Sequence, residues 1–207
     1  MSEQFIEQAK ASQGALERLF KGLPGIRDYA DKELRRDADK RLREQLALQL
    51  SEQKLQLINL QQQLLQRSGL RHLDLVYRLV QRVQTLADRI KSASYGYAGL
   101  FDAVKIQETQ LAALHRFDLG LAAQIGALAD TIAAATTAVG DEPQLVAALN
   151  KLETTIAALT TYFGQRQAAV TSTDLLAAAA LPPLDPALDA QIAAHLAAVP
   201  PVTAETK

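Results

Sequence analysis

Histidine and carboxylate side chains offer the most versatile chemistry in a protein, and this chain has few histidines to offer. His72, His115 and His195 are the only three, they fall in separate predicted helices, and cysteine is absent. A di-iron helical bundle requires two Glu-x-x-His pairs, and neither pair occurs. His115 and Asp118 are three residues apart, which we interpret as a structural hydrogen-bonded pair rather than a catalytic dyad. The sequence therefore predicts no catalytic residue, no metal and no cofactor.

Motifs for phosphate binding and nucleophilic catalysis are also missing. The sequence contains no Gly-x-x-x-x-Gly-Lys-Ser/Thr, no Gly-x-Gly-x-x-Gly and no Gly-x-Ser-x-Gly. These motifs place backbone amides around phosphates or expose a serine on a sharp turn. We therefore expect a protein that is not an enzyme and has no small-molecule substrate.

A stripe of arginines is the strongest charged pattern, and it consists of Arg67, Arg71, Arg78, Arg82 and Arg89. The last four are spaced 7, 4 and 7, which places them on one side of a helix. Such a stripe can bind the phosphates of lipids or nucleic acids. It can equally be a solvated face that pairs with carboxylates of a neighbouring helix or subunit, and this second interpretation is favoured. Nucleic acid is disfavoured because no aromatic residues alternate with the arginines for base stacking.

Two charged residues occupy apolar positions of heptad patterns, and they are Asp118 and Arg166. In a helical hairpin that turns near Gly140 they lie on facing helices, about 22 and 26 residues from the turn. An ion pair between them is offset by roughly one helical turn. A polar pair in an apolar seam often fixes the register of the helices, so we predict this role for Asp118 and Arg166.

Helix formers dominate the chain, and Pro24 is followed by no proline until Pro143. We predict an all-α fold, an elongated antiparallel helical bundle of coiled-coil hairpins with a short C-terminal helical tail. The expected helices cover about 2–21, 25–67, 70–92, 101–139 and 142–169. The expected domains are an N-terminal amphipathic helix (1–23), a long-helix bundle (24–170, with hairpins 25–93 and 101–170) and an Ala/Pro-rich tail with a short helix (171–207). Gly96 and Gly99 mark a bend or a hinge.

The second of these helices has two apolar stripes. One consists of Leu46, Leu50, Leu57, Leu60 and Leu64, and the other of Leu48, Leu55, Ile58 and Leu65. A helix that is apolar on two sides is typically buried on both. We therefore expect both stripes inside the bundle, with glutamines on the remaining face.

The two ends of the chain carry amphipathic faces whose partner the sequence leaves open. Near the N-terminus the face consists of Phe5, Ile6, Leu16, Leu19, Phe20 and Leu23, and it can enter a lipid interface or pack on the bundle. Packing is favoured because the charges of this segment balance and its polar face is not rich in lysine. Near the C-terminus the face consists of Leu188, Ile192, Leu196 and Val199 and can dock on the bundle, on a neighbour or on nothing.

Charge and hydropathy suggest a soluble location. Residues 1–117 have 19 Lys and Arg against 14 Asp and Glu, and residues 118–207 have 3 against 9. This asymmetry favours partner contacts or head-to-tail self-association through unlike surfaces, and it can equally be compositional drift between two helical hairpins. The start of the chain lacks the pattern of a signal peptide, and the longest apolar stretches fall short of a membrane span. We expect a cytoplasmic protein whose membrane contact, if any, is peripheral at the inner membrane surface.

These patterns predict a non-enzymatic helical scaffold or interaction protein that self-associates or binds a protein partner through heptad seams. The order of elements is a short amphipathic leading helix, a long hairpin and then shorter helices. This outline resembles that of the phage-shock and ESCRT-III-like proteins. The resemblance implies the alternative, a membrane-surface remodelling or stress protein whose partner is an anionic membrane.

Overall fold

The computed structural model describes residues 32–68, 70–93, 108–171 and 186–198. This part of the chain forms helices and contains no strand. The helices are α2 (Lys32–Ser68), α3 (Leu73–Ser92), α5 (Glu108–Thr137), α6 (Glu142–Thr171) and α8 (Pro186–Ala198). The predicted all-α helical bundle is confirmed.

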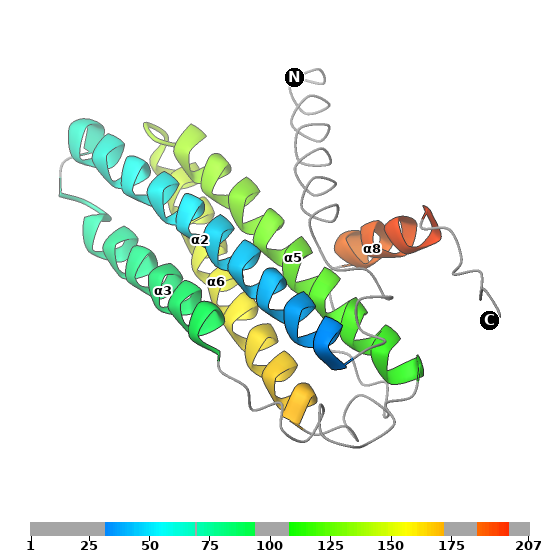
Figure 1. The fold of residues 1–207 in the computed structure, drawn as a ribbon. Coiled ribbons are helices and arrows are strands. Elements are labelled where there is room, and N and C mark those ends of the chain that lie inside the picture. Colours follow the sequence, from blue (N-terminus) through cyan, green and yellow to red (C-terminus); the bar gives the residue numbers. More distant parts are fainter. Residues whose placement is uncertain (1–31, 69, 94–107, 172–185, 199–207) are drawn as a thin grey trace, which may run out of the picture.

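Helices α2, α3, α5 and α6 run up, down, up and down beside one another (Figure 1). Around the bundle, α2 packs against α3 and α5, and α6 packs against α5 and α3. We call the end where α2 turns into α3 and α5 turns into α6 the turn end. The opposite end, where α3 and α6 finish, is called the cluster end, because a cluster of buried polar residues lies near it. Short α8 lies outside the bundle against α5.

The core of α2 follows a single seam. The seam residues are spaced 4, 4, 3, 4, 3 and 4, and they are Leu42, Leu46, Leu50, Gln53, Leu57, Leu60 and Leu64; Arg43 and Ala47 are buried beside them. This spacing keeps one face of a helix turned towards its neighbours. Gln53 belongs to this buried face, so the expectation that glutamines occupy only the remaining face is wrong at this position.

The second apolar stripe of α2 is not inside the bundle. Leu48, Leu55 and Leu65 are 60%, 58% and 53% exposed, while Ile58 is half-buried against the core. The expectation that α2 is buried from both sides is therefore wrong. The physical reason is that, within the described residues, only α3 and α5 flank α2 closely, and neither covers its outer face.

The heptad patterns of α5 and α6 are buried as predicted where the structure describes them. Leu121, Ile125, Leu128 and Ile132 of α5 are at most 1% exposed. On α6 the same holds for Leu145, Leu149, Leu152, Ile156, Leu159 and Phe163. Burial of these side chains stabilises the hairpin by roughly 1.5–3 kcal/mol each before the entropy of ordering is subtracted.

Two residues define the turn between α5 and α6. Gly140 has φ of 110°, a left-handed conformation that a side chain would strain. Asp141 then caps α6, because its Oδ1 accepts a hydrogen bond from the Gln144 backbone N–H at 3.1 Å. This pair of residues ends one helix and begins the next.

One stretch of α5 overturns an expectation about hydropathy. Within the 23 residues His115–Thr137 a window of 18 residues has a mean hydropathy of 1.3, so by length and composition this stretch can cross a membrane. The expectation that every apolar stretch is too short for a membrane span is therefore wrong. Half of this window is buried inside the bundle, as in the core helix of many soluble proteins.

Several predicted features lie outside the described residues. They include the N-terminal face of Phe5, Ile6, Leu16, Leu19, Phe20 and Leu23, the bend at Gly96 and Gly99, and Val199 of the tail face. The start of α5 before Glu108 and the stretch from 172 to 185 also lie outside.

Candidate functional site

A buried ion pair joins α5 to α6 near the cluster end. The Arg166 Nε donates a hydrogen bond to Asp118 Oδ1 at 2.5 Å, and the two side chains are 2% and 1% exposed. These are the two residues that the heptad patterns place on facing helices. Removing both charges from water is costly, so such a pair persists only with close geometry.

The direction of helical side chains explains how the pair forms despite its offset. Arg166 is about one turn farther from Gly140 than Asp118 is. Side chains on a helix tilt towards its N-terminus, and the N-terminus of α6 is at the turn end. The long arginine side chain therefore leans back along α6 by about the length of one turn.

Other polar and aromatic residues surround this ion pair. We call the ion pair together with His115, Phe117 and Tyr162 the polar cluster. His115 is 6% exposed one turn before Asp118 on α5, and Tyr162 is 4% exposed one turn before Arg166 on α6. The ring centroids of Phe117 and Tyr162 are 5.3 Å apart. Burial raises the pKa of the Tyr162 phenol above its ordinary value of 10, and the Asp118 carboxylate raises it further. The phenol is therefore neutral across the physiological range.

Arg43 of α2 is a further buried charge towards this end, and it ties α2 to α3. It is 8% exposed, and its Nη1 donates a hydrogen bond to the Lys91 carbonyl oxygen at 3.1 Å. This carbonyl is in the last turn of α3, where carbonyl groups lack partners within the helix. Sequence patterns alone do not single out Arg43, although it lies one position from the buried seam residue Leu42.

The polar cluster is suited to holding helices together rather than to catalysis. Asp118 and Arg166 neutralise each other and are almost fully enclosed, so neither reaches a solvent-borne substrate. Within the described ranges, no group of three or more His, Asp or Glu side chains is placed to hold a metal ion.

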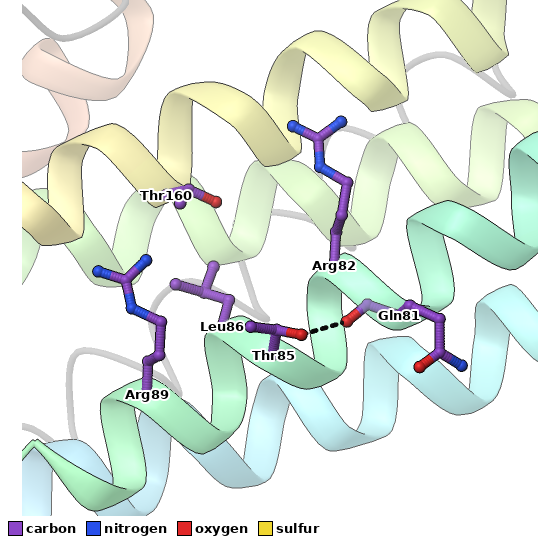
Figure 2. Close-up of a pocket in the computed structure, with 6 residues that line it drawn as sticks. All are labelled: Gln81, Arg82, Thr85, Leu86, Arg89 and Thr160. Carbon is purple, nitrogen blue, oxygen red and sulfur yellow. Dashed lines mark hydrogen bonds between the residues drawn. The ribbon is translucent and has the colours of Figure 1, made fainter.

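Part of the arginine stripe faces α6. Figure 2 shows Arg82 and Arg89 extending from α3 towards α6 on either side of Leu86, with Thr160 between them. With Gln81 and Thr85 these residues line an open groove of about 220 Å³.

Carboxylates of α6 pair with two members of the stripe. Arg82 Nη1 lies 3.2 Å from Glu153 Oε1. Arg71 Nη1 lies 3.3 Å from Glu142 Oε1, which is also 2.9 Å from His72 Nε2. These contacts correspond to the interpretation of the stripe as a face that pairs with a neighbouring helix. As exposed pairs they contribute little to stability.

The remaining stripe residues have other surroundings. The Arg89 guanidinium carbon lies 5.9 Å from the centroid of the buried Phe163 ring, within the range of a cation–π contact. Arg67 and Arg78 are exposed to solvent.

The C-terminal tail face lies against the bundle where the structure describes it. Ile192 is 1% exposed and Leu188 is half-buried against the core. The Arg116 Nη2 donates to Asp189 Oδ1 at 2.6 Å, which joins α5 to α8. Of the three options that the sequence leaves open, the described residues show docking on the chain's own bundle. The side chain of Leu196 lies outside the described set.

Gln53 marks a polar contact inside the apolar seam. Its Nε2 donates to the Ile125 carbonyl oxygen at 2.6 Å, so it joins α2 to the middle of α5. The signal was present in the sequence, because Gln53 falls between Leu50 and Leu57 at spacings of three and four.

No protein-family model, curated protein or solved structure matches this chain.

Proposed function

We propose that this protein is a non-enzymatic interaction protein that binds a helical protein partner through the outer face of α2. The observation that supports this proposal is the exposed second stripe, which we call the outer stripe and define as Leu48, Leu55, Ile58 and Leu65. Single exposed leucines are ordinary on protein surfaces. Four large apolar residues at spacings of 7, 3 and 7 are instead typical of a coiled-coil seam.

A rigid scaffold supports this face. The inner seam of α2 is at most 6% exposed from Leu42 to Leu64 and packs against α3 and α5. Gln53 and Arg43 fix α2 to its neighbours through hydrogen bonds to backbone carbonyl oxygens. Because α2 is held in this way, the outer stripe is already arranged for a partner, which lowers the entropic cost of binding.

The residues beside the outer stripe favour a protein over a lipid partner. Exposed neighbours on the outer side of α2 include Glu44, Glu52, Gln56 and Asn59. A helix that lies on an anionic membrane typically has a wide apolar face bordered by lysine and arginine. Arg41 and Lys54 also lie beside the stripe, so a narrow stripe with mixed acidic, basic and amide neighbours suits a second helix better.

Photo-crosslinking in the organism that encodes the protein tests this proposal. A photoreactive amino acid replaces Leu55, and the matched control places it at Ala158, an exposed position on α6. We expect a protein adduct at position 55 that is absent at position 158. The adduct at position 55 should disappear when Leu48→Glu is added, because a specific coiled-coil contact at Leu55 depends on the neighbouring apolar contact at Leu48. Equal adducts at both positions, or adducts to lipid alone at position 55, would overturn the proposal.

A further inference from the structure

The spacing of the outer stripe is the same when read in either direction. The intervals 7, 3 and 7 are symmetric about a point between Gln56 and Leu57. A two-fold interface requires a surface that is complementary to itself, because residue i contacts residue j and residue j contacts residue i. We infer that the partner of the outer stripe is a second copy of this chain, with the two α2 helices antiparallel. This inference rests on the proposed function.

In this arrangement each seam residue of α2 faces the seam residue of the second copy for which the two numbers add to 113, and for the residues that flank the seam the sum differs from 113 by two. Leu48 then meets Leu65, and Leu55 meets Ile58, so each apolar layer has two large side chains. Between these apolar layers Ser51 meets Gln62, and both of these residues are polar.

The charges beside the stripe distinguish antiparallel from parallel pairing. The flanking pairs nearest the symmetry point are Glu52 with Asn59 and Lys54 with Gln61, so no like charges meet. A parallel pair in register instead places Glu44 against Glu44, and Arg41 against Arg41, in the same seam. Like charges opposite each other destabilise such contacts, so the antiparallel arrangement is favoured.

An exposed aromatic residue of α3 extends the same surface. Lys54 Nζ donates to Gln84 Oε1 at 2.7 Å, which sets the relative level of α2 and α3. Two turns from this contact, towards the turn end, Tyr77 is level with Gln61 and is 55% exposed. Tyr77 therefore borders the apolar centre of the stripe and is placed to contact a second α2.

The N-terminal segment of the same chain is a less suitable occupant. If residues 2–21 form the helix that the sequence predicts and the chain reverses directly after it, that helix reaches along about as many residues of α2 as it contains. Its far end is then level with about residue 45, short of Leu48. Leu55, Ile58 and Leu65 lie farther still towards the turn end.

The size of the interface predicts a pair that depends on concentration. Four partly exposed apolar side chains from each copy belong to the small class of protein contacts, below about 1,200 Å² in total. Interfaces of this class are commonly transient. The second copy should therefore dissociate on dilution.

Disulfide trapping of the full chain tests the pairing directly, because the natural chain has no cysteine. The variants are Ser51→Cys and Gln62→Cys, which oxidise separately and as a mixture. A disulfide requires Cα atoms within about 7 Å, while these positions are 11 residues, roughly 16 Å, apart along the helix. We expect a disulfide-linked dimer in the mixture and almost none from either variant alone. Dimers from each variant alone would show parallel pairing, and no dimer in any sample would show no pairing; both results overturn the inference.

Sedimentation equilibrium provides a second readout with a matched control. Leu55→Glu should weaken the pair at least about tenfold, since it buries a charge in two layers. Val146→Glu makes a similar change at an exposed apolar residue of α6 and should leave the pair unchanged. Equal effects of the two variants would overturn the inference. If the pure protein never dimerises but position 55 still crosslinks another protein in cells, this inference fails while the proposed function stands. If the protein neither dimerises nor crosslinks another protein, both fail.

Discussion

The turn end and the cluster end of the bundle both join helices by ion pairs, yet the two sites differ in burial. At the turn end, Arg71 and His72 of the α2–α3 connection contact Glu142 of α6, whose side chain is 44% exposed. At the cluster end, Arg166 contacts Asp118 with both side chains at most 2% exposed. Solvent screens the first contact, and protein encloses the second.

Similar ion pairs therefore constrain the molecule to different degrees. An exposed pair tolerates the loss of one partner because water replaces it. A buried pair does not, because the remaining charge stays buried away from water. We therefore expect the cluster end to define the register of α5 and α6, and the turn end to depend mainly on its backbone conformation.

Asp118→Ala should have the largest effect. It leaves Arg166 buried without its carboxylate, and we expect a loss of about 3–5 kcal/mol in the free energy of unfolding. Urea unfolding measures this loss. The control is the double variant Asp118→Leu with Arg166→Met, which should recover most of the stability. A loss below about 1 kcal/mol for Asp118→Ala would remove the difference between the ends.

Gly140→Ala should have the largest effect at the turn end. A Cβ here meets no atom within 4 Å, so the cost comes from the φ of 110° alone. We expect a loss of about 1–2 kcal/mol, the usual cost of a left-handed conformation for a residue with a side chain. Thermal unfolding monitored by circular dichroism tests this, and an unchanged midpoint would contradict it.

Gly164→Ala should change stability in the opposite direction. Gly164 lies inside α6, two residues before Arg166, and a Cβ there also meets no atom within 4 Å. Alanine restricts the unfolded chain more than glycine does, so we expect a gain of about 0.5–1 kcal/mol. The same thermal measurement, made beside Gly140→Ala, shows whether the two glycines differ in sign.

Glu142→Gln should have the smallest effect, and that effect should depend on pH. The hydrogen bond from His72 lowers the pKa of the Glu142 carboxyl below its ordinary value of 4.5. A carboxyl with a lowered pKa stabilises the fold above the ordinary value, and this contribution is lost as the pH falls through the folded-state pKa. Melting temperatures of both proteins from pH 7 to pH 3 should therefore converge on acidification. A difference that grows in acid would contradict this assignment.

Much of the fold follows from the sequence because the side chains that define it repeat at regular spacings. Local patterns and one turn determine the helices α3 and α6, the cap at Asp141 and the pairing of Asp118 with Arg166. The exposure of the outer stripe could not be predicted, because it depends on how many neighbours α2 has. Leu48 and Leu50 are chemically identical, and only the positions of α3 and α5 make one exposed and the other buried.

The candidate site is only partly predictable for a similar reason. Arg43 and Gln53 donate hydrogen bonds to the backbone carbonyl oxygens of Lys91 and Ile125. Every residue has such a carbonyl oxygen, so residue type does not mark the acceptor. No pairing of residue types reveals such contacts before the relative levels of the helices are known. The Asp118–Arg166 contact, in contrast, joins two charges that each break an apolar pattern.

The up-and-down order of the four long helices also bears on how the polypeptide reaches its native state. Each half, α2 with α3 and α5 with α6, brings together stretches that are adjacent along the chain, which favours rapid folding. Both members of the buried ion pair belong to the second half. The covalent connection from residue 94 to 107 joins halves that already contact each other through α2 with α5 and α3 with α6. Two separately synthesised fragments, 1–93 and 108–207, should accordingly reassemble by complementation into the native arrangement.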